Sequence, residues 1–518
     1  MEHDAGAADL REGELRPAEL RGCKVLLARV DGRVHAMGGT CPHAGGPLHE
    51  GVLARGKNGA VVLCPWHKAA FRLDTGAHVS PPAVDDVPSY PVREQGGRLL
   101  IELDATTRPA PPAVVGADKL FVVVGAGAAG TVAAQTLRDA GFGGRLLLVG
   151  REDRLPYDRT VLSKYTLSGQ KGGEKSPLHD AAFYEANRIE RVVAEVTALN
   201  PAARTVGFAD GTSLRYDQAL LATGSTPRAL EVPGHDLPGV HLLRSAADAE
   251  AIVRSAGHAR RAVVVGGGFI AVEAAGSLRE RGLDVAVVMN SEEPFEKNLG
   301  PEVGGAFRRF HEKQGVVFHP RAEVAAVEGD GRVERVRLKD GTVLPAELLV
   351  AGLGVRPATS MLRGVDLRKD GGVPVGPDLL AADGLYAAGD LAAFPDRGEG
   401  EPIRVEHWRV AEQHGRVAAL NMLARVSQGG GERFEAVPYF WTIHYKKRLD
   451  YVGHASGWDR VEIDGDLEEP DFAAYYVKEG LVKAVAGWGR DTAMAMAIGL
   501  MDGRRDWTAA ALQEALAG

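Results

Sequence analysis

Two glycine turns, each directly after a run of β-branched residues, constrain the fold more than any other feature of this chain. The first is a G-x-G-x-x-G turn at residues 125–130, after "FVVV", and the second is a G-x-G-x-x-A turn at residues 266–271, after "AVVV". The small residues of such a turn allow a tight bend, a close approach of backbone to a pyrophosphate and the packing of helix on strand. Because the free N–H groups and the dipole of a helix N-terminus favour an anion, each turn predicts a phosphate site.

Both turns lie within a strand, helix, strand pattern. The first pattern is "KLFVVVGAGAAGTVAAQTLRDAGFGGRLLLVGRED" and the second, from residue 262, is "AVVVGGGFIAVEAAGSLRERGLDVAVVMN". This order predicts two βαβ units with parallel sheets. Glu152 follows the second strand of the first unit, where an acid binds ribose hydroxyls. Two units imply two dinucleotides, FAD and NAD(P)H, and the spacing does not assign them.

The N-terminal hundred residues carry two Cys/His pairs. Cys41 and His43 lie two residues apart, and Cys64 and His67 lie three apart. Thiolate and imidazole bind zinc or the iron of an iron–sulfur cluster. Since each segment contributes one Cys and one His, the pattern favours a two-iron cluster in which one iron takes both thiolates and the other both imidazoles. A structural zinc site is the alternative. The third Cys, Cys23, stands in an apolar run and is predicted to be buried.

The remaining composition limits the class of protein. A chain of 518 residues predicts about three or four domains. The net charge of −8 has no basic block, which disfavours nucleic acid as a partner. No apolar run predicts a membrane span, and the N-terminus lacks a signal layout. With only three Cys, we expect a reducing, cytoplasmic compartment.

The segments "CPHAGGPL", "CPWHKAAF" and "LDTGAHVSPP" resemble the cluster-binding loops of Rieske ferredoxin domains, over about residues 10–103. The resemblance implies a [2Fe–2S] cluster held by Cys41, His43, Cys64 and His67. Two departures stand out: "ARGKNGA" predicts an extended hairpin, and Lys68 replaces a common Gly. We expect both to shape the surface on which an external partner docks. Without Cys for a loop disulfide, we expect the lower part of the Rieske range of about −150 to +300 mV.

Five further motifs occur in one order along the chain: "LPYDRTVLSK" (155–164), "ALLATGS" (219–225), "LYAAGDLAAF" (385–394), "RVEHWRVAEQHGRVAALNM" (404–422) and "VPYFWTIHY" (437–445). Together they resemble FAD-dependent ferredoxin reductases of the pyridine nucleotide-disulfide oxidoreductase superfamily. The Rieske-plus-reductase order resembles the apoptosis-inducing factor-like proteins. Disulfide reductases of this fold use a Cys pair beside the flavin, but no Cys follows Cys64. Flavin electrons therefore have no protein disulfide to reduce in this chain.

The reductase resemblance implies roles for individual residues. Lys164 lies towards the hydride-accepting edge of the flavin, and Glu273, where the nicotinamide docks, pairs with it; these two are the predicted catalytic residues. The glycine turn of residues 125–130 and Glu152 hold the adenosine half of FAD. Arg159 lies near the flavin, Asp390 at its ribityl or pyrophosphate region, and Trp408 and Trp441 at its ring. The full predicted cofactor set is Gly125, Gly127, Ala128, Ala129, Gly130, Glu152, Arg159, Lys164, Ala222, Thr223, Gly224, Gly266, Gly268, Phe269, Ile270, Glu273, Gly354, Gly389, Asp390, Glu406, His407, Trp408 and Trp441.

Other interpretations of these residues stay open. The two Trp are also compatible with core packing, and Arg159 and Lys164 with a solvated turn. Met289 and Asn290 stand where NADH-specific relatives carry an acid, and no Arg is evident for a 2′-phosphate. Since Asn290 can bond ribose hydroxyls, NADH is favoured over NADPH.

The expected fold is multidomain: an all-β Rieske unit, α/β tandem dinucleotide-binding domains and a C-terminal α+β unit. The expected boundaries are 1–103 for the Rieske unit, 104–117 for a linker, 118–240 and 369–431 for a split FAD domain, 241–368 for the NAD(P)H domain and 432–518 for a unit that shields the flavin and offers a dimer face. The expected function is electron transfer from NAD(P)H through FAD and the cluster to an external acceptor. A diaphorase that reduces quinone or oxygen, and an NADH-responsive signalling protein, are the alternatives.

Overall fold

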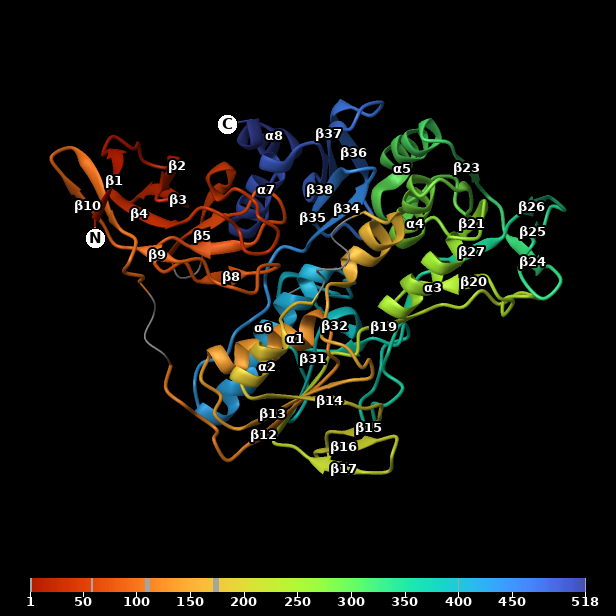
Figure 1. The fold of residues 1–518 in the computed structure, drawn as a ribbon, viewed down its shortest axis with the longest axis horizontal. Coiled ribbons are helices and arrows are strands. Elements are labelled where there is room, and N and C mark those ends of the chain that lie inside the picture. The colour runs from red at the N-terminus through yellow and green to blue at the C-terminus, as the bar shows by residue number, and fades with distance from the viewer. Residues whose placement is uncertain (1, 57–58, 108–111, 171–176, 399, 518) are drawn as a thin grey trace.

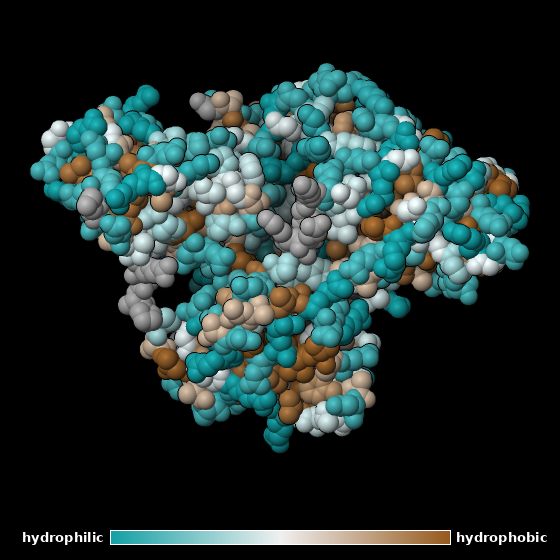
Figure 2. All heavy atoms as spheres, viewed as in Figure 1, coloured by the Kyte–Doolittle hydropathy of each residue, from teal (hydrophilic) through white to brown (hydrophobic). Residues whose placement is uncertain are grey.

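The computed structural model describes residues 2–56, 59–107, 112–170, 177–398 and 400–517. Figure 1 shows the N-terminal unit at one side and the first glycine-turn unit below the centre, with the C-terminal unit above it. The second glycine-turn unit lies on the opposite side from the N-terminal unit. Hydrophilic side chains cover most of the face seen in Figure 2.

The N-terminal unit is all β, as predicted, and forms three small antiparallel sheets of order β1-β11-β10, β2-β3-β4-β9 and β5-β6-β7-β8. The strands are β1 (Glu2–Ala7), β2 (Leu15–Leu20), β3 (Cys23–Val30), β4 (Arg33–Gly38), β5 (Val52–Gly56), β6 (Gly59–Leu63), β7 (Ala70–Arg72), β8 (His78–Ser80), β9 (Ser89–Tyr90), β10 (Val92–Gln95) and β11 (Arg98–Glu102), with a 3-10 helix η1 (Leu48–Glu50). A hairpin turn at Asp31-Gly32 joins β3 and β4, and both residues adopt positive φ there.

Two N-terminal expectations meet different outcomes. Strands β5 and β6 pair antiparallel across "ARGKNGA", and residues 57–58 of this segment lie outside the described residues. The prediction for Cys23 is wrong, since its side chain is exposed. Cys23 is the first residue of β3, and burial in that strand begins only at Val25.

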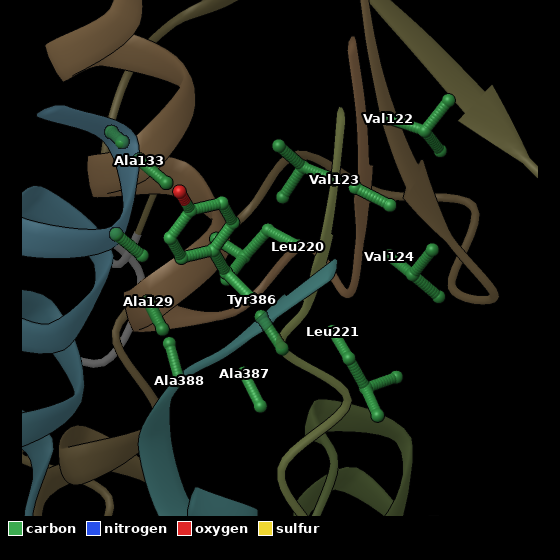
Figure 3. Packing of buried hydrophobic residues seen from close by; sticks show 14 of the residues in the cluster. Val122, Val123, Val124, Ala129, Ala133, Leu220, Leu221, Tyr386, Ala387 and Ala388 are labelled. Carbon is green, nitrogen blue, oxygen red and sulfur yellow. The ribbon is translucent and has the colours of Figure 1, made fainter. Parts of the chain in front are cut away.

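The first glycine-turn unit is built on a six-stranded sheet of order β14-β13-β12-β18-β31-β30, parallel except for β30. Its elements are β12 (Leu120–Val124), α1 (Ala128–Asp139), β13 (Arg145–Gly150), η2 (Arg159–Val161), η3 (Leu162–Thr166), α2 (Ala181–Ala186), β14 (Ile189–Val193), β15 (Val196–Asn200), β16 (Thr205–Phe208), β17 (Ser213–Arg215), β18 (Gln218–Leu221), β29 (Val373–Pro374), β30 (Leu380–Ala382), β31 (Leu385–Ala387), η4 (Gly389–Leu391), β32 (Ala392–Pro395), η5 (Asp396–Gly398), β33 (Pro402–Ile403) and α6 (Trp408–Ser427). Figure 3 shows Tyr386 lying against Leu220 and the Ala129 and Ala133 side of α1.

The second glycine-turn unit has an all-parallel five-stranded sheet of order β20-β27-β21-β22-β23. Its elements are β20 (Val240–Leu242), α3 (Ala246–Ala256), β21 (Arg261–Val265), α4 (Phe269–Glu280), β22 (Asp284–Val288), α5 (Glu296–Lys313), β23 (Val316–His319), β24 (Val324–Glu328), β25 (Arg335–Leu338), β26 (Val343–Pro345) and β27 (Leu348–Ala351). The short pair β19 (Ser225–Pro227) and β28 (Val355–Pro357) joins the two units. The two predicted βαβ units are thereby confirmed.

The C-terminal unit is an antiparallel sheet of order β34-β35-β38-β37-β36 followed by two helices. Its elements are β34 (Tyr439–His444), β35 (Lys447–Gly453), β36 (Arg460–Asp466), β37 (Asp471–Lys478), β38 (Leu481–Trp488), α7 (Asp491–Gly503) and α8 (Ala509–Ala517). The segment "TAMAMAIGLM" lies in α7 and packs Met494, Ile498 and Met501 into the core of this unit. Across the described ranges, no helix is long and apolar enough to cross a membrane.

Candidate functional site: a two-nucleotide cleft beside a Cys/His site

One large cleft brings together segments from three parts of the chain. It has a volume of about 1510 Å³ and is lined by both glycine turns, by η2 and η3, by the start of α6 and by β34. Every residue of the predicted cofactor set lines it except Gly130 and Gly266. This volume exceeds the roughly 300–1,000 Å³ of a typical single-ligand pocket, as two dinucleotides require.

The first glycine turn leaves a helix end free for an anion. Gly125 has φ +118°, and a Cβ there would lie 2.2 Å from the carbonyl oxygen of Ala222. A Cβ on Gly130 would lie 1.8 Å from the carbonyl oxygen of Gly125, so this residue allows α1 to approach the strand. The N-cap of α1 is Gly127, and no acidic side chain lies in the first turn. The N–H groups of this helix end are therefore available to a pyrophosphate.

The second glycine turn repeats this geometry. Gly266 has φ +126°, and a Cβ there would lie 2.3 Å from the carbonyl oxygen of Gly352. Helix α4 begins after Gly268, again without a side-chain cap or an acid in its first turn. Two helix N-termini with the same free donors thus face one cleft.

Glu152 and Arg159 lie together, although the sequence placed them at different parts of FAD. Arg159 donates to Glu152 over 2.5 Å, and the Tyr157 hydroxyl donates to the other carboxylate oxygen over 2.7 Å. Burial acts to raise the pKa of Glu152, but the guanidinium and the hydroxyl outweigh it and lower that pKa. The carboxylate is charged and held in place. The sequence did not single out Tyr157, although it stands inside the quoted motif "LPYDRTVLSK".

Lys164 and Glu273 form the pair that the resemblance implies. Lys164 lies on η3, a π-helical turn, and its Nζ is 3.1 Å from Glu273 Oε2. The carboxylate also accepts hydrogen bonds from Ser163 Oγ at 2.5 Å and Thr442 Oγ1 at 2.6 Å. Glu273 is 4% exposed, and the ion pair with Lys164 balances the charge of its carboxylate in this buried position. Both side chains line the cleft.

Asp390 closes the cleft from the α6 side. It lies in the 3-10 helix η4. Its Oδ2 accepts from Ser225 Oγ at 2.6 Å and from Arg244 Nη2 at 3.0 Å. Arg244 was not predicted, because it stands after β20 in a stretch without a motif.

The aromatic wall of the cleft comes from α6 and β34. Trp408 and Trp441 line it together with Phe440, whose ring centroid lies 4.5 Å from that of His407. Burial lowers the pKa of His407 to about 3, so the ring is neutral, and its buried Nδ1 has no hydrogen-bond partner. An unpartnered buried nitrogen beside aromatic rings fits a heterocycle that offers hydrogen bonds, as the flavin ring does.

The Cys/His segments form a second site. Cys41 and Cys64 are each 2% exposed, and the interaction between the two thiols lowers the pKa of Cys64 and raises that of Cys41. The ring centroids of His43 and His67 lie 4.7 Å apart. His67 Nδ1 is buried without a partner, and burial keeps the pKa of this imidazole well below its usual range. A thiol pair next to an imidazole pair, with a free ring nitrogen, fits a cluster that binds sulfur at one iron and nitrogen at the other.

Among the described residues, no group of three or more His, Cys, Asp or Glu side chains gathers around the position of a single ion. The four residues are arranged two by two, which is the donor set that a two-iron cluster uses.

The second Cys/His loop docks onto the rest of the molecule. The ring of His67 lies 4.9 Å from that of Trp441, which lines the cleft. Lys68 is fully buried, and its Nζ forms an ion pair with Asp450 of β35 at 3.0 Å and donates to the carbonyl of Asp491 at 3.1 Å. Arg448 pairs with Asp491 at 2.5 Å. This buried charged cluster joins the loop to the C-terminal unit.

The expectation that Lys68 shapes a surface for an external partner is therefore wrong. Lys68 has φ +62°, the left-handed conformation that explains why Gly suits this position. Its side chain points into the molecule because Asp450 and the carbonyl of Pro65 (2.5 Å) satisfy the ammonium there. From α6, Arg409 reaches the same region and donates to Ser80 Oγ over 2.8 Å and to the carbonyl of Pro81 over 2.9 Å. None of these interdomain partners carried a sequence signal.

The fold and the two sites define a class: a flavin-type, pyridine nucleotide-dependent reductase with an attached iron–sulfur domain. Residues 119–415 match the family model "Pyridine nucleotide-disulphide oxidoreductase", residues 3–91 match "Rieske [2Fe-2S] domain", and residues 439–516 match "Reductase C-terminal". The chain belongs to the pyridine nucleotide-disulphide oxidoreductase family, in its Rieske-containing, apoptosis-inducing factor-like form. It is an FAD-dependent oxidoreductase that uses NAD(P)H.

Individual relatives agree with this assignment. Apoptosis-inducing factor 3 of Mus musculus is 38% identical over 501 residues, covering 93% of this chain and 81% of the relative. Rhodocoxin reductase of Rhodococcus erythropolis is 34% identical over 358 residues, covering 68% of this chain and 83% of the relative. A covalent putidaredoxin reductase–putidaredoxin complex superposes with a TM-score of 0.72 at 30% identity, over 78% of this chain and 99% of that chain.

Proposed function

We propose that this protein takes electrons from NAD(P)H at the large cleft and passes them one at a time to its own Rieske cluster, which reduces an external acceptor. When bound, FAD accepts a hydride from the nicotinamide and gives up single electrons, and the cluster accepts one electron at a time. The observation that carries the proposal is the contact of His67 with Trp441. One side chain thus belongs to the cluster site, and its neighbour lines the flavin cleft.

The residues of the cleft have distinct proposed tasks. The N-terminus of α1 holds the pyrophosphate of FAD, and Asp390 binds near its ribityl chain. The N-terminus of α4 holds the pyrophosphate of NAD(P)H. Lys164, anchored by Glu273, places a positive charge beside the flavin ring, where it stabilises the reduced form. Cys41 and Cys64 hold one iron, and His43 and His67 hold the other.

The test is to reduce the protein with NADH and to record its EPR spectrum. A Rieske signal of low average g-value that appears on NADH addition supports the route, and reduced flavin without that signal contradicts it. Cys64→Ala is the matched variant: cytochrome c reduction falls at least about tenfold while ferricyanide reduction, which draws on the flavin, persists. If both activities persist, the diaphorase alternative replaces the proposal.

We propose NADH as the preferred donor. The strand end at Asn290 lacks an acid, and the neighbouring Arg321, which the sequence did not single out, pairs with Glu292 at 2.8 Å. The Glu292 carboxylate beside this guanidinium repels a 2′-phosphate and competes with it for Arg321. A tenfold preference for NADPH in kcat/KM would overturn this choice.

The proposed acceptor is a ferredoxin-type protein or another one-electron carrier, met in a reducing cytoplasm. The names of the relatives, rhodocoxin reductase and putidaredoxin reductase, support a redox-protein acceptor. A homodimer through the C-terminal unit is part of the proposal, and size-exclusion chromatography with and without NADH tests it. The domain boundaries given above also stand as proposals. Their support is the six-stranded sheet, which takes β12, β13, β14 and β18 from one segment and β30 and β31 from the other.

A further inference from the structure

A hydrogen-bonded chain runs from Glu273 through the interior of the protein, away from the large cleft. Thr442 Oγ1 donates to Glu273 Oε1 at 2.6 Å. His444 Nε2 is 2.9 Å from Thr442 Oγ1, and His311 Nε2 is 3.1 Å from His444 Nδ1. The Tyr445 hydroxyl reaches His311 Nδ1 at 3.5 Å, the outer limit of a hydrogen bond.

These contacts specify where the protons lie. Because the Thr442 hydroxyl donates to Glu273, it accepts from Nε2–H of His444. The Nδ1 of His444 then accepts from Nε2–H of His311, whose own Nδ1 accepts from Tyr445. One tautomer, Nε2–H, satisfies both rings. In this arrangement every donor points towards Glu273. When the proton of each ring moves from Nε2 to Nδ1, the donors point the other way, towards Tyr445.

Burial keeps the two imidazoles in the state that a proton relay needs. Thr442, His444 and His311 are 1%, 2% and 0% exposed. Burial lowers the pKa of His444 to about 3, and that of His311 well below its usual range, so both rings are neutral donor–acceptors. Aromatic rings enclose them: Phe307 lies 5.1 Å from His444, and Phe318 lies 6.2 Å from His311.

The chain ends near a second cavity whose lining, apart from Lys164 and Glu273, differs from that of the large cleft. This cavity of about 130 Å³ is lined by Lys164, Glu273, His444 and Tyr445 at its inner side and by the exposed Glu280 and Lys446 at its outer side. The charged groups that face the chain are Lys164, Glu280, Arg279 and Lys446. Glu273 therefore has a polar connection to solvent that does not pass through the nucleotide cleft.

The proton balance of the proposed function requires such a connection. When the C4–H bond of NADH breaks, each of two oxidised iron–sulfur acceptors finally receives one electron, and one proton remains. The balance is NADH + 2 acceptors(ox) → NAD⁺ + H⁺ + 2 acceptors(red). A nucleotide bound in the cleft would lie beside Glu273, whereas the hydrogen-bonded chain leads from Glu273 to residues outside the cleft lining. We propose that His311, His444 and Thr442 form a proton path that connects Glu273 with solvent on the Tyr445 side. This inference rests on the proposed function.

The test compares His444→Gln with the wild-type holoenzyme. Glutamine keeps a donor and an acceptor but cannot move a proton from one side to the other. We expect kcat for NADH oxidation by ferricyanide to fall roughly tenfold or more, with an altered solvent deuterium isotope effect and pH profile. His241→Gln is the matched control, because His241 makes a single hydrogen bond to Ser255 outside this chain and its loss leaves kcat unchanged. Unchanged kcat in His444→Gln would assign proton exchange to the cavity and overturn the proposal.

Two further measurements separate a relay from a structural role. In His444→Ala, added imidazole restores turnover whereas pyrrole, which has the same size but no basic nitrogen, does not; equal rescue by both contradicts the proposal. In full-length protein with ¹⁵N-labelled histidine, His311 and His444 show neutral Nε2–H signals at pH 7, before and after flavin removal. A protonated ring at either site, or different tautomers at the two sites, overturns the chain. If the substitution His444→Gln leaves kcat unchanged while NADH still reduces the cluster, the proton path is ruled out and the proposed function stands.

Discussion

Two buried lysine–carboxylate pairs stand out among the residues that the structure describes, and their surroundings differ. Lys164 and Glu273 join η3 to α4 at 3.1 Å, with side chains 9% and 3% exposed. Lys68 and Asp450 join the second Cys/His loop to β35 at 3.0 Å, with side chains 0% and 1% exposed. The first pair lines both the nucleotide cleft and the second cavity. The second lines neither.

The difference shows what each pair does. Lys164 keeps access to a ligand, and its partner is connected onward to Thr442, so the charge is available for chemistry. Lys68 is closed off from solvent. Burial lowers the pKa of its ammonium group, and the nearby Asp450 carboxylate offsets only part of this lowering. A sealed pair contributes little net stability compared with apolar residues, but removal of one partner is costly. We therefore expect Lys68 to fix how the Rieske unit docks and Lys164 to act at the bound cofactor.

Lys164→Met gives the largest expected effect. It removes the charge beside the flavin ring and leaves Glu273 buried without its cation, so kcat/KM for NADH with ferricyanide should fall roughly 10²–10³-fold. Steady-state kinetics with ferricyanide measure this. Lys68→Met is the comparison variant and should retain ferricyanide reduction. A similar loss in both variants would show that the two pairs do not differ in function.

Lys68→Met should act on the cluster route alone. It leaves the carboxylates of Asp450 and Asp491 to share the guanidinium of Arg448, which gives the docking interface an excess negative charge and so loosens the contact between His67 and Trp441. We expect cytochrome c reduction to fall roughly tenfold and limited proteolysis to release the Rieske unit faster.

The double variant Lys68→Met/Asp450→Asn provides the control, since it removes both charges and keeps an acceptor for the Tyr439 hydroxyl. It should recover much of the lost cytochrome c activity. No recovery would mean that Lys68 acts other than through Asp450.

An exposed pair gives a smaller expected effect. Arg321 and Glu292 are 76% and 46% exposed, so their mutual attraction is weak. Glu292→Ala should release Arg321 for a 2′-phosphate and raise the NADPH/NADH ratio of kcat/KM by roughly five- to tenfold. An unchanged ratio would show that Arg321 does not reach the nucleotide.

The smallest effect concerns Glu412, a carboxyl that, unlike Glu273 and Asp450, has no charged partner at contact distance among the described side chains. It is fully buried on α6, both oxygens lack hydrogen-bond partners, and burial raises its pKa well above the usual range. Because the folded state holds this proton more tightly than the unfolded state, the stability it contributes is present below about pH 4.3 and is lost as pH rises towards the folded-state pKa. Glu412→Gln should raise Tm by a few degrees at pH 8 and change it little at pH 4. The same shift at both pH values would contradict this account.

The sequence predicted those parts of the site whose chemistry is local. The glycine turns and the Cys/His pairs are short motifs, since pyrophosphate binding and iron ligation need fixed spacings. The Lys68–Asp450 pair carried no such signal, because its partners meet only through tertiary docking. The prediction that Cys23 is buried was wrong for a related reason. An apolar run identifies β3 but does not show that the first residue of the strand is exposed to solvent. Tyr157 and Phe440 stood inside quoted motifs and could have been named as cleft residues.

The Lys68–Asp450 pair also has a consequence for the order of synthesis. Asp450 leaves the ribosome about 380 residues after Lys68, which corresponds to roughly 20–80 s at about 5–20 residues per second. During that interval the loop that carries Cys64 and His67 has no partner to close over it. The nascent Rieske unit therefore passes through a stage in which its ligands are open to cluster delivery, and completion of β35 ends that stage. A chain truncated before residue 447 would keep the loop open, and would accept or lose its iron more readily than the finished protein.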